Sequence, residues 1–224
     1  MPTSYLHQLT DIVELIVFTN PQSVLDVGVG FGKYGVLCRE YLDLRDGREE
    51  YYNWRRRVDG IEIFEAYLTP LHAFIYDHIY LGDALKILPG LETTYDLLLL
   101  VDVIEHFDYE TGLNLLNACQ KAARNVLVST PHQFISQKAA FGNVFETHRS
   151  HWRKKHFSRF APKCFIPNEY SLICYLGEDT PRIKQTMLNF PRRLKNTFPF
   201  LRSPYHLAKK WVQGLRRKRH AAPI

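Results

Sequence analysis

Acidic side chains stand at the ends of four successive apolar segments in this 224-residue sequence. Each segment is a short apolar run typical of a buried β-strand. The four carboxylates are those of Asp26, Glu62, Asp83 and Asp102. One such residue is explained as a helix N-cap or a solvated loop charge. Four at equivalent positions favour a shared site, because α/β proteins bind ligands where the carboxyl ends of parallel strands meet.

Three glycines alternate after the first of these strands, in the stretch VLDVGVGFGKYG. Glycine costs backbone entropy, so Gly28, Gly30 and Gly32 indicate a sharp turn or a close approach of the backbone to a ligand. Lys33 stands where a dinucleotide-binding fingerprint requires its third glycine. An NAD-dependent oxidoreductase is therefore only the third candidate.

The charge of these residues indicates the kind of ligand. A carboxylate at the end of the second strand suits a ribose, because one Glu accepts hydrogen bonds from both ribose hydroxyls. An acidic lining repels phosphate groups and favours a ligand that carries positive charge. The sequence therefore predicts a site for a positively charged nucleoside.

Strands and helices alternate along the chain, as in a parallel sheet with helices on both faces. Helical periodicity is present in residues 5–18, 32–42, 66–77 and 111–123. Strands are predicted at residues 23–28, 58–64, 79–84, 95–101, 125–131, 163–167 and 171–177. The last two are close enough in sequence to pair as an antiparallel hairpin. We predict a Rossmann-like, doubly wound, mostly parallel seven-stranded sheet with one antiparallel edge strand, and a charged surface excursion at residues 43–57.

Four stretches, VLDVGVGFG, GIEIF, GDA and YDLLLLVDVIEHF, resemble the successive motifs of class I S-adenosylmethionine-dependent methyltransferases. They come in the order of that family and cover about residues 22–132, with a looser match to about residue 177. The resemblance implies an enzyme that takes a methyl group from the cofactor S-adenosyl-L-methionine.

The resemblance also implies a role for each matching residue. Asp26, Gly28, Gly30 and Gly32 would form the wall against the amino-acid part of the cofactor. Glu62 would take the ribose hydroxyls, with Ile63 beside the adenine. Asp83 would accept from the adenine amino group, and Ala84 would pack near the ring. Asp102 would lie near the methionyl amine and the sulfonium centre.

Histidines are the candidate bases for the methyl acceptor. A base is needed where the acceptor is an alcohol, a phenol or a protonated amine. His106 follows the fourth strand directly, and the other candidates are His132, His148 and His151. We select His106 and His148 as the catalytic candidates; a packing role is the alternative for His106.

The segment at residues 141–157 resembles a pattern, N-x-x-E-x-H-x-S-x-W, of prokaryotic-type members of the family. Its competing interpretation is a solvated loop that starts a helix. Glu146, His148 and His151 lack the spacing of a zinc site, so no metal is expected.

Two functions of different class are open. The first is S-adenosylmethionine-dependent methyl transfer to a small-molecule, glycan or lipid-linked acceptor. A nucleic-acid base methyltransferase is disfavoured, because VDVIEHF stands where a D/N-P-P-Y/F run would be. The alternative is a non-catalytic cofactor-binding domain that recruits RNA or anionic membrane through a basic tail.

The charge distribution divides the chain at about residue 180. From Pro181 onward there are twelve Lys and Arg and no Asp or Glu, whereas the preceding part has seventeen basic and twenty-three acidic residues. We predict a methyltransferase domain at residues 1–180 and a basic C-terminal extension, partly helical or disordered, at residues 181–224. A basic amphipathic helix there would bind an anionic membrane surface or RNA, or the segment is a solvated tail.

The cysteines and the N-terminus indicate the compartment. The four cysteines have no CxxC spacing and are expected to be reduced, and the start has no basic region of a signal peptide. We therefore expect a cytoplasmic protein, brought to a membrane surface if the extension binds one. The oligomeric state is left open.

Overall fold

The computed structural model describes residues 4–44 and 53–188. One compact unit ends at Pro181, and a second begins at Arg182. Most of the basic extension at residues 181–224 therefore lies outside the described residues, and its predicted structure and partners stay predictions. Within the described ranges, no helix has the length and apolar character needed to cross a membrane.

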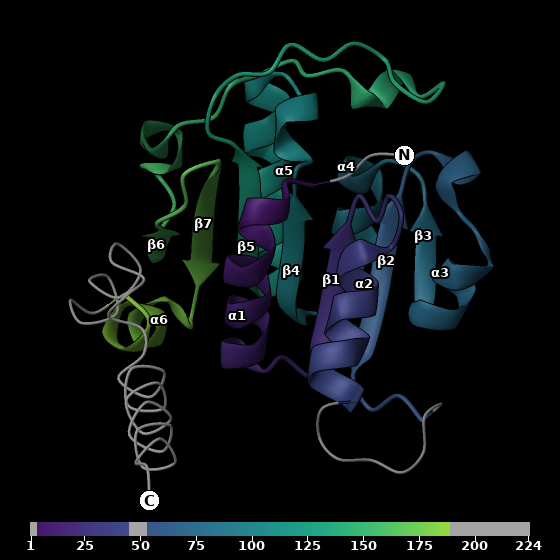
Figure 1. The fold of residues 1–224 in the computed structure, drawn as a ribbon, viewed down its shortest axis with the longest axis horizontal. Coiled ribbons are helices and arrows are strands. Elements are labelled where there is room, and N and C mark those ends of the chain that lie inside the picture. The colour runs from purple at the N-terminus through teal and green to yellow at the C-terminus, as the bar shows by residue number, and fades with distance from the viewer. Residues whose placement is uncertain (1–3, 45–52, 189–224) are drawn as a thin grey trace, which may run out of the picture. The chain divides into compact units, whose positions relative to one another are not determined.

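A seven-stranded sheet forms the centre of the first unit, in the order β3-β2-β1-β4-β5-β7-β6 (Figure 1). Its strands are β1 (Ser23–Val27), β2 (Arg57–Glu62), β3 (His78–Leu81), β4 (Tyr95–Val101), β5 (Ala123–Pro131), β6 (Lys163–Ile166) and β7 (Ser171–Gly177). Strands β1 to β5 pair in parallel, and β7 runs antiparallel to both β5 and β6. The predicted mostly parallel sheet and the β6–β7 hairpin are confirmed.

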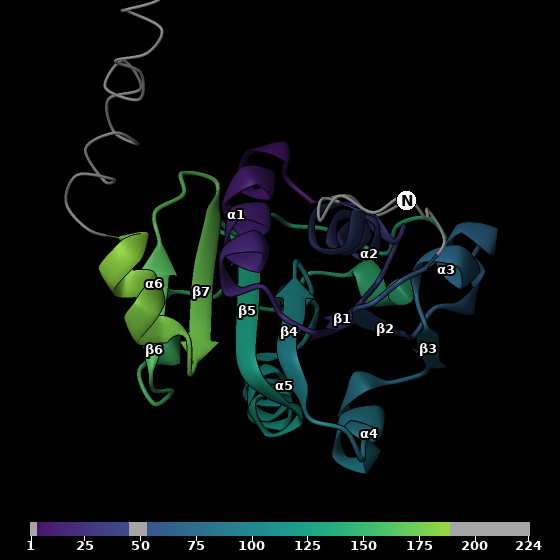
Figure 2. The same ribbon diagram turned by 90° about the horizontal axis from the view of Figure 1, so that it is seen from below.

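Helices cover both faces of the sheet, as expected (Figure 2). One face carries α1 (Leu9–Thr19), α2 (Lys33–Cys38) and α3 (Pro70–Ile75), and the other carries α4 (Ala84–Ile87) and α5 (Tyr109–Ala122). A further helix, α6 (Thr180–Thr186), follows β7. The continuous apolar run of β4 requires this arrangement, because residues 97–100 alternate between the two faces and all four are buried.

The strand order places a switch point between β1 and β4. The chain runs outward from β1 through β2 to β3 and then returns to the other side of β1 to form β4. Adjacent loops therefore separate at the carboxyl ends of β1 and β4, which is where open α/β sheets bind ligands. The glycine loop follows β1, and Asp102 follows β4.

Two predicted helices differ from those observed. The helix expected at residues 66–77 is divided into a 3-10 turn (Glu65–Tyr67) and α3, because Pro70 disfavours helical geometry at Thr69, which is extended. The helix expected at residues 32–42 is α2 followed by a π-helical turn (Arg39–Asp43).

The two ends of the charged excursion meet at the buried guanidinium of Arg39. Arg39 donates to Asp43 at 3.1 Å, to Asp77 at 2.9 Å and to the carbonyl oxygens of Ile75 and Arg56 at 2.8 and 2.6 Å. Arg39 and Asp43 are both buried. The interpretation of residues 43–57 as a surface excursion is therefore wrong for Asp43. Its Oδ1 accepts from the N–H groups of Arg55 and Arg56, so Asp43 joins the two ends of the excursion. Residues 45–52 lie outside the described part.

This network predicts a large cost for removing the guanidinium. The substitution Arg39→Met leaves the buried Asp43 carboxylate without its ion pair, so we expect the free energy of unfolding to fall by about 3–5 kcal/mol in urea unfolding. The control is Arg124→Met, because Arg124 is exposed and lies 3.7 Å from Asp96. It should cost at most about 1 kcal/mol. Equal, small losses for the two variants would contradict the assignment.

Candidate functional site

Two adjacent cavities lie at the carboxyl ends of β1, β2 and β4. Their volumes are about 250 and 420 Å³. They share five lining residues, Gly28, Gly30, Asp102, His106 and Glu146. After the ligands that the sequence predicts, we call the smaller one the nucleoside cavity and the larger one the acceptor cavity.

The nucleoside cavity brings together most of the residues predicted to bind a cofactor. Its lining includes Gly28, Gly30, Glu62, Ile63, Asp83, Ala84 and Asp102. The predicted residues Asp26 and Gly32 are not part of the lining of either cavity. Gly32 instead caps the N-terminus of α2 with a left-handed backbone, φ +85°.

The glycine loop has the close packing that its sequence indicates. A Cβ added to Gly28, whose φ is +78°, would lie 2.6 Å from Cγ2 of Val103, so a side chain does not fit there. Gly30 is held from both sides, since its N–H donates to Glu62 at 3.0 Å and its carbonyl accepts from Nε2 of His72 at 3.0 Å. Nδ1 of His72 accepts from the N–H of Thr69, which leaves the proton on Nε2.

Glu62 is buried at the end of β2 and lines the nucleoside cavity. Its carboxylate accepts from the N–H groups of Gly30 and Phe64, at 3.0 and 2.9 Å. Burial raises the pKa of Glu62, the backbone donors lower it, and the nearby charge of Glu146 raises it further. Each oxygen has a second lone pair, so Glu62 can accept from a diol while it holds the loop.

Asp102 occupies the boundary of the two cavities, with a left-handed backbone at φ +52°. Its Oδ2 accepts from Nε2 of Gln8 at 2.6 Å, and its buried Oδ1 has no hydrogen-bond partner in the described residues. Burial raises the pKa of Asp102 to about 6, although Gln8 and the charge of Lys33 lower it. A cationic donor in the cavity would satisfy Oδ1.

Asp83 lines the nucleoside cavity and also caps a helix. Its Oδ1 accepts from the N–H of Leu85 at 2.9 Å and so caps α4. The two interpretations of a strand-end carboxylate, helix N-cap and ligand-binding group, are compatible for Asp83, because its second oxygen is left for a ligand.

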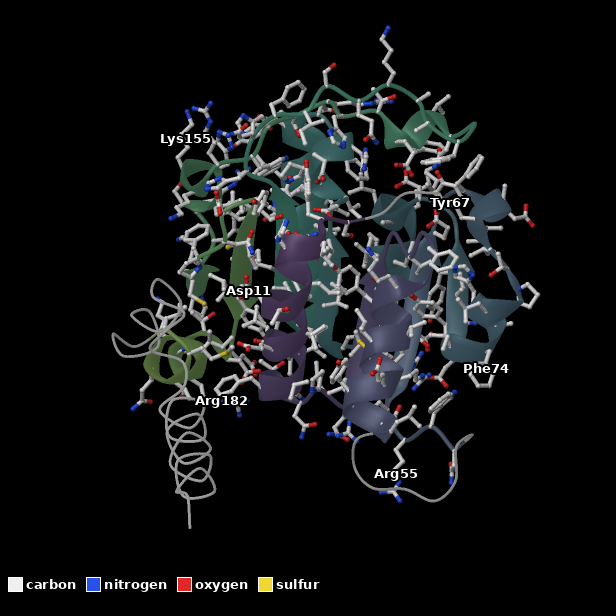
Figure 3. The ribbon with its side chains drawn as sticks, in the orientation of Figure 1. Asp11, Arg55, Tyr67, Phe74, Lys155 and Arg182 are labelled. Carbon is white, nitrogen blue, oxygen red and sulfur yellow. The ribbon has the colours of Figure 1, made fainter. Side chains whose placement is uncertain are left out.

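The connection from β5 to β6 crosses above the carboxyl ends of the strands and returns (Figure 1). We call residues 132–160 the crossing segment. Tyr67, labelled in Figure 3, donates from its hydroxyl to Glu146 of this segment at 2.9 Å. The N–H groups of Arg149 and Ser150 donate to the carbonyl of Glu105 at 2.8 and 3.1 Å. The segment therefore forms part of both cavities.

The residues of the N-x-x-E-x-H-x-S-x-W pattern hold the crossing segment in place. Asn143 caps the 3-10 turn Val144–Glu146 by accepting from the N–H of Phe145 at 2.9 Å. Trp152 is buried, packs against Gly112 of α5 and donates to Oγ of Ser150 at 2.8 Å. The pattern is thus explained by local capping and packing, together with the placement of Glu146 and His148.

His106 and His148 come together, with ring centroids 4.9 Å apart. Nδ1 of His148 lies 2.7 Å from the carbonyl oxygen of Ile135, and Nδ1 of His106 lies 3.3 Å from that of Thr147. Burial, followed by the neighbouring His148, lowers the pKa of His106 to about 4. His106 is therefore neutral near pH 7. Of the other candidates, His151 places Nε2 3.1 Å from the carbonyl oxygen of His132.

Several site residues are missing from the sequence prediction. Gln8, Lys33, Tyr67, His72 and Arg149 all contact or line the site. Gln8 is fully buried at the end of the 3-10 turn Leu6–Gln8, at helical spacing from the buried Ile12 and Leu15 of α1. A polar residue in line with an apolar face is a signal that the sequence does offer. The others come from elements whose approach to the cavities depends on the tertiary structure.

Solved methyltransferase structures share this fold. A putative O-methyltransferase from Nostoc punctiforme PCC 73102 aligns with 77% of this chain and 55% of its own, at 18% identity and a TM-score of 0.52. PigF, in a structure with SAH, aligns with 75% of this chain and 53% of its own, at 13% identity and a TM-score of 0.54. A SAM-dependent methyltransferase from Archaeoglobus fulgidus aligns with 71% of both chains, at 18% identity and a TM-score of 0.52.

The chain spans about half the length of the first two proteins. No protein-family model matches the sequence, and neither does any curated protein. The fold is that of the class I S-adenosylmethionine-dependent methyltransferases, as the sequence motifs predicted.

Asp26 lies beneath the glycine loop, and the structure predicts a pH-dependent stability from it. Its buried carboxylate accepts from the hydroxyl of Tyr76 at 2.6 Å. Burial raises the pKa of Asp26 to about 7, the bond from Tyr76 lowers it, and the charge of Glu62 raises it. Since the folded pKa exceeds the unfolded one, the protonated form stabilises the fold at low pH, and that contribution is lost as pH rises through about 7.

We therefore expect Asp26→Asn to become increasingly stabilising, relative to the original chain, as pH rises from about 5 to about 7. The difference in free energy of unfolding should increase by up to about 1.4 kcal/mol per pH unit, measured by urea unfolding. The matched control is Glu92→Gln, which removes an exposed carboxylate. Parallel pH profiles for the original chain and Asp26→Asn would contradict the prediction.

Proposed function

We propose that this chain transfers a methyl group from S-adenosyl-L-methionine to a small-molecule, glycan or lipid-linked acceptor. The observation that carries the proposal is the convergence of seven predicted cofactor residues on one cavity next to the switch point of the sheet. The methyl carbon forms a bond to the acceptor atom as its bond to sulfur breaks. The electron pair stays on sulfur, giving S-adenosylhomocysteine, and the acceptor proton passes to a base.

The nucleoside cavity supplies the partners that an adenosine requires. Glu62 is suited to the ribose hydroxyls, and Ile63 and Ala84 give apolar surface for the adenine ring. Asp83 keeps one carboxylate oxygen for the adenine amino group. These residues would hold the adenosine in the nucleoside cavity, which adjoins the acceptor cavity at Gly28, Gly30 and Asp102.

The boundary between the cavities suits the charged end of the cofactor. Asp102, with its unpartnered buried Oδ1, would accept from the methionyl ammonium and lie near the sulfonium. Lys33 lines the acceptor cavity and would attract the methionyl carboxylate. The glycine loop adds no side chain at Gly28, so the methionyl chain can lie against its backbone.

The acceptor is proposed to enter beside the crossing segment. His106 and His148 line the acceptor cavity and are the groups placed to handle the acceptor proton. Exposed apolar side chains of the segment line the cavities, Ile135 and Phe141 the acceptor cavity and Phe145 the nucleoside cavity. Such a lining favours an acceptor with an apolar part, because a polar acceptor alone would leave it hydrated. Methyl transfer to such a molecule can depend mainly on alignment.

The alternative function requires the basic extension to recruit RNA or anionic membrane. Most of that extension lies outside the described residues, so its role stays a prediction from the sequence. The carboxylates of Glu62 and Asp102, which are suited to the ribose and the methionyl ammonium, support cofactor use rather than a degenerate site.

The first experiment is a calorimetric titration with S-adenosylmethionine, with NAD as the control ligand. We expect binding of the former only, and a loss of about 10- to 100-fold in affinity for Glu62→Gln, because a charge-assisted hydrogen bond contributes about 1.5–3 kcal/mol. The control variant is Glu65→Gln, three residues further on and exposed. Thermal melting checks that Glu62→Gln keeps the fold. Unchanged affinity in a folded Glu62→Gln variant would overturn the ribose assignment.

A further inference from the structure

One cluster in the acceptor cavity is not explained by binding of a nucleoside. Glu105, His106 and His148 each offer one ligand atom, and these atoms lie within 4.8 Å of one another. Glu105 and His106 come from the turn after β4, and His148 comes from the crossing segment. The trio differs from the one considered from sequence spacing, because Glu146 bonds to Tyr67 and His151 lies against a backbone carbonyl.

We propose that Glu105, His106 and His148 form a binding site for a divalent first-row transition-metal ion. Two imidazoles and one carboxylate are a donor set that Zn²⁺, Co²⁺, Fe²⁺ and Mn²⁺ accept, whereas Mg²⁺ and Ca²⁺ prefer oxygen donors alone. This reverses the expectation of no metal that sequence spacing gave.

The carboxylate is the first observation that points to a cation. Glu105 is buried, and its Oε2 has no hydrogen-bond partner in the part of the chain that the structure describes. A buried carboxylate oxygen without a partner is costly unless a ligand satisfies it. A nitrogen of each imidazole lies within 4.8 Å of a carboxylate oxygen of Glu105, so the cluster is more than an acidic patch.

The histidines are the second observation. Nδ1 of each ring lies against a backbone carbonyl, that of Ile135 for His148 and that of Thr147 for His106. A ring that donates from Nδ1 presents Nε2 as its basic nitrogen, and metal-binding histidines are typically oriented by such a bond. His148 is fixed further, because its N–H donates to the carbonyl of Gln137 at 3.0 Å.

The separation of the ligand atoms is compatible with closure on an ion. Metal–ligand distances of about 2.0–2.2 Å place neighbouring ligand atoms about 3 Å apart. The three atoms therefore need to approach by less than about 2 Å, which side-chain rotation provides. Asp102 lies next to the cluster, so the site has further negative charge to attract a cation.

The position suggests what the ion would do. Three protein ligands leave coordination positions for water or an acceptor oxygen, and an oxygen bound to such an ion loses its proton more readily. Glu105, His106 and His148 all line the cavity proposed for the acceptor, and with the ion bound the two histidines act as ligands instead of as bases for the acceptor proton. This role rests on the proposed methyl transfer, whereas the metal site itself does not.

The test is direct metal binding to the full chain after treatment with a chelator and dialysis. Co²⁺ is titrated with visible absorption as the readout, Zn²⁺ is added in competition, and Mg²⁺ serves as the comparison ion. We expect one equivalent of Co²⁺ to give ligand-field bands that Zn²⁺ removes and Mg²⁺ does not. The absence of saturable Co²⁺ binding would overturn the proposal.

Substitutions locate the ion. His148→Gln and Glu105→Gln should each weaken Co²⁺ binding by at least about 100-fold, because losing a partner of a metal ligand alone costs about 10- to 100-fold. His151→Gln is the matched control, a nearby histidine outside the trio, and should bind Co²⁺ as the original chain does. His148 is only half-buried, so that variant serves if Glu105→Gln does not fold. Unchanged binding in a folded His148→Gln variant would overturn the assignment.

Titration with S-adenosylmethionine in the absence and presence of Zn²⁺ separates the two proposals. Metal binding without cofactor binding would support the metal site and contradict the proposed function. Cofactor binding without metal binding would support the proposed function and contradict the metal site.

Discussion

Burial of carboxylates at the ends of parallel strands is the constraint on which the rest of this structure depends. Burial raises the pKa of Asp26, Glu62, Asp102 and Glu105. Apart from histidine, the basic residues among those lining the two cavities are Lys33 and Arg149. The lining has five carboxylates, those of Glu62, Asp83, Asp102, Glu105 and Glu146, so the cavities favour a cation over an anion. A bound cation would favour the charged carboxylates that burial disfavours, and both proposed ligands, a sulfonium nucleoside and a divalent metal ion, are cations.

Most of the carboxylates that line the cavities also accept a hydrogen bond from another part of the protein. Glu62 holds the glycine loop, Asp83 caps α4, and Asp102 is tied to Gln8 at the start of the chain. Each thereby avoids the cost of a buried charge without donors while keeping lone pairs for a ligand. Among the described residues, two lining residues have a carboxylate oxygen without a partner: Oδ1 of Asp102, which lines both cavities, and Oε2 of Glu105, which lines the acceptor cavity. Binding and folding thus use the same side chains.

The crossing segment contributes Ile135, Gln137, Phe141, Glu146 and His148 to the acceptor cavity. It is anchored by backbone bonds to Glu105, by the Tyr67–Glu146 bond and by the buried Trp152. These anchors fix His148 against His106 and leave the apolar side chains of the segment exposed. Variation at Ile135 and Phe141, which line the acceptor cavity and not the nucleoside cavity, would therefore change the acceptor side alone.

The sequence by itself determined the sheet and most of the nucleoside cavity, because alternating apolar runs fix the strands and residues at strand ends meet at one edge. That reasoning placed Gly28, Glu62, Asp83 and Asp102 at one cavity, whereas Asp26, whose carboxylate accepts from Tyr76, is not part of the lining. Only the tertiary structure decided how Gln8, His72 and the crossing segment approach the site. The pairing of His148 with Glu105 and His106 joins residues more than forty positions apart, and no local periodicity encodes such a contact. It depends on the path of a long irregular connection, which is set by buried anchors rather than by secondary-structure propensity.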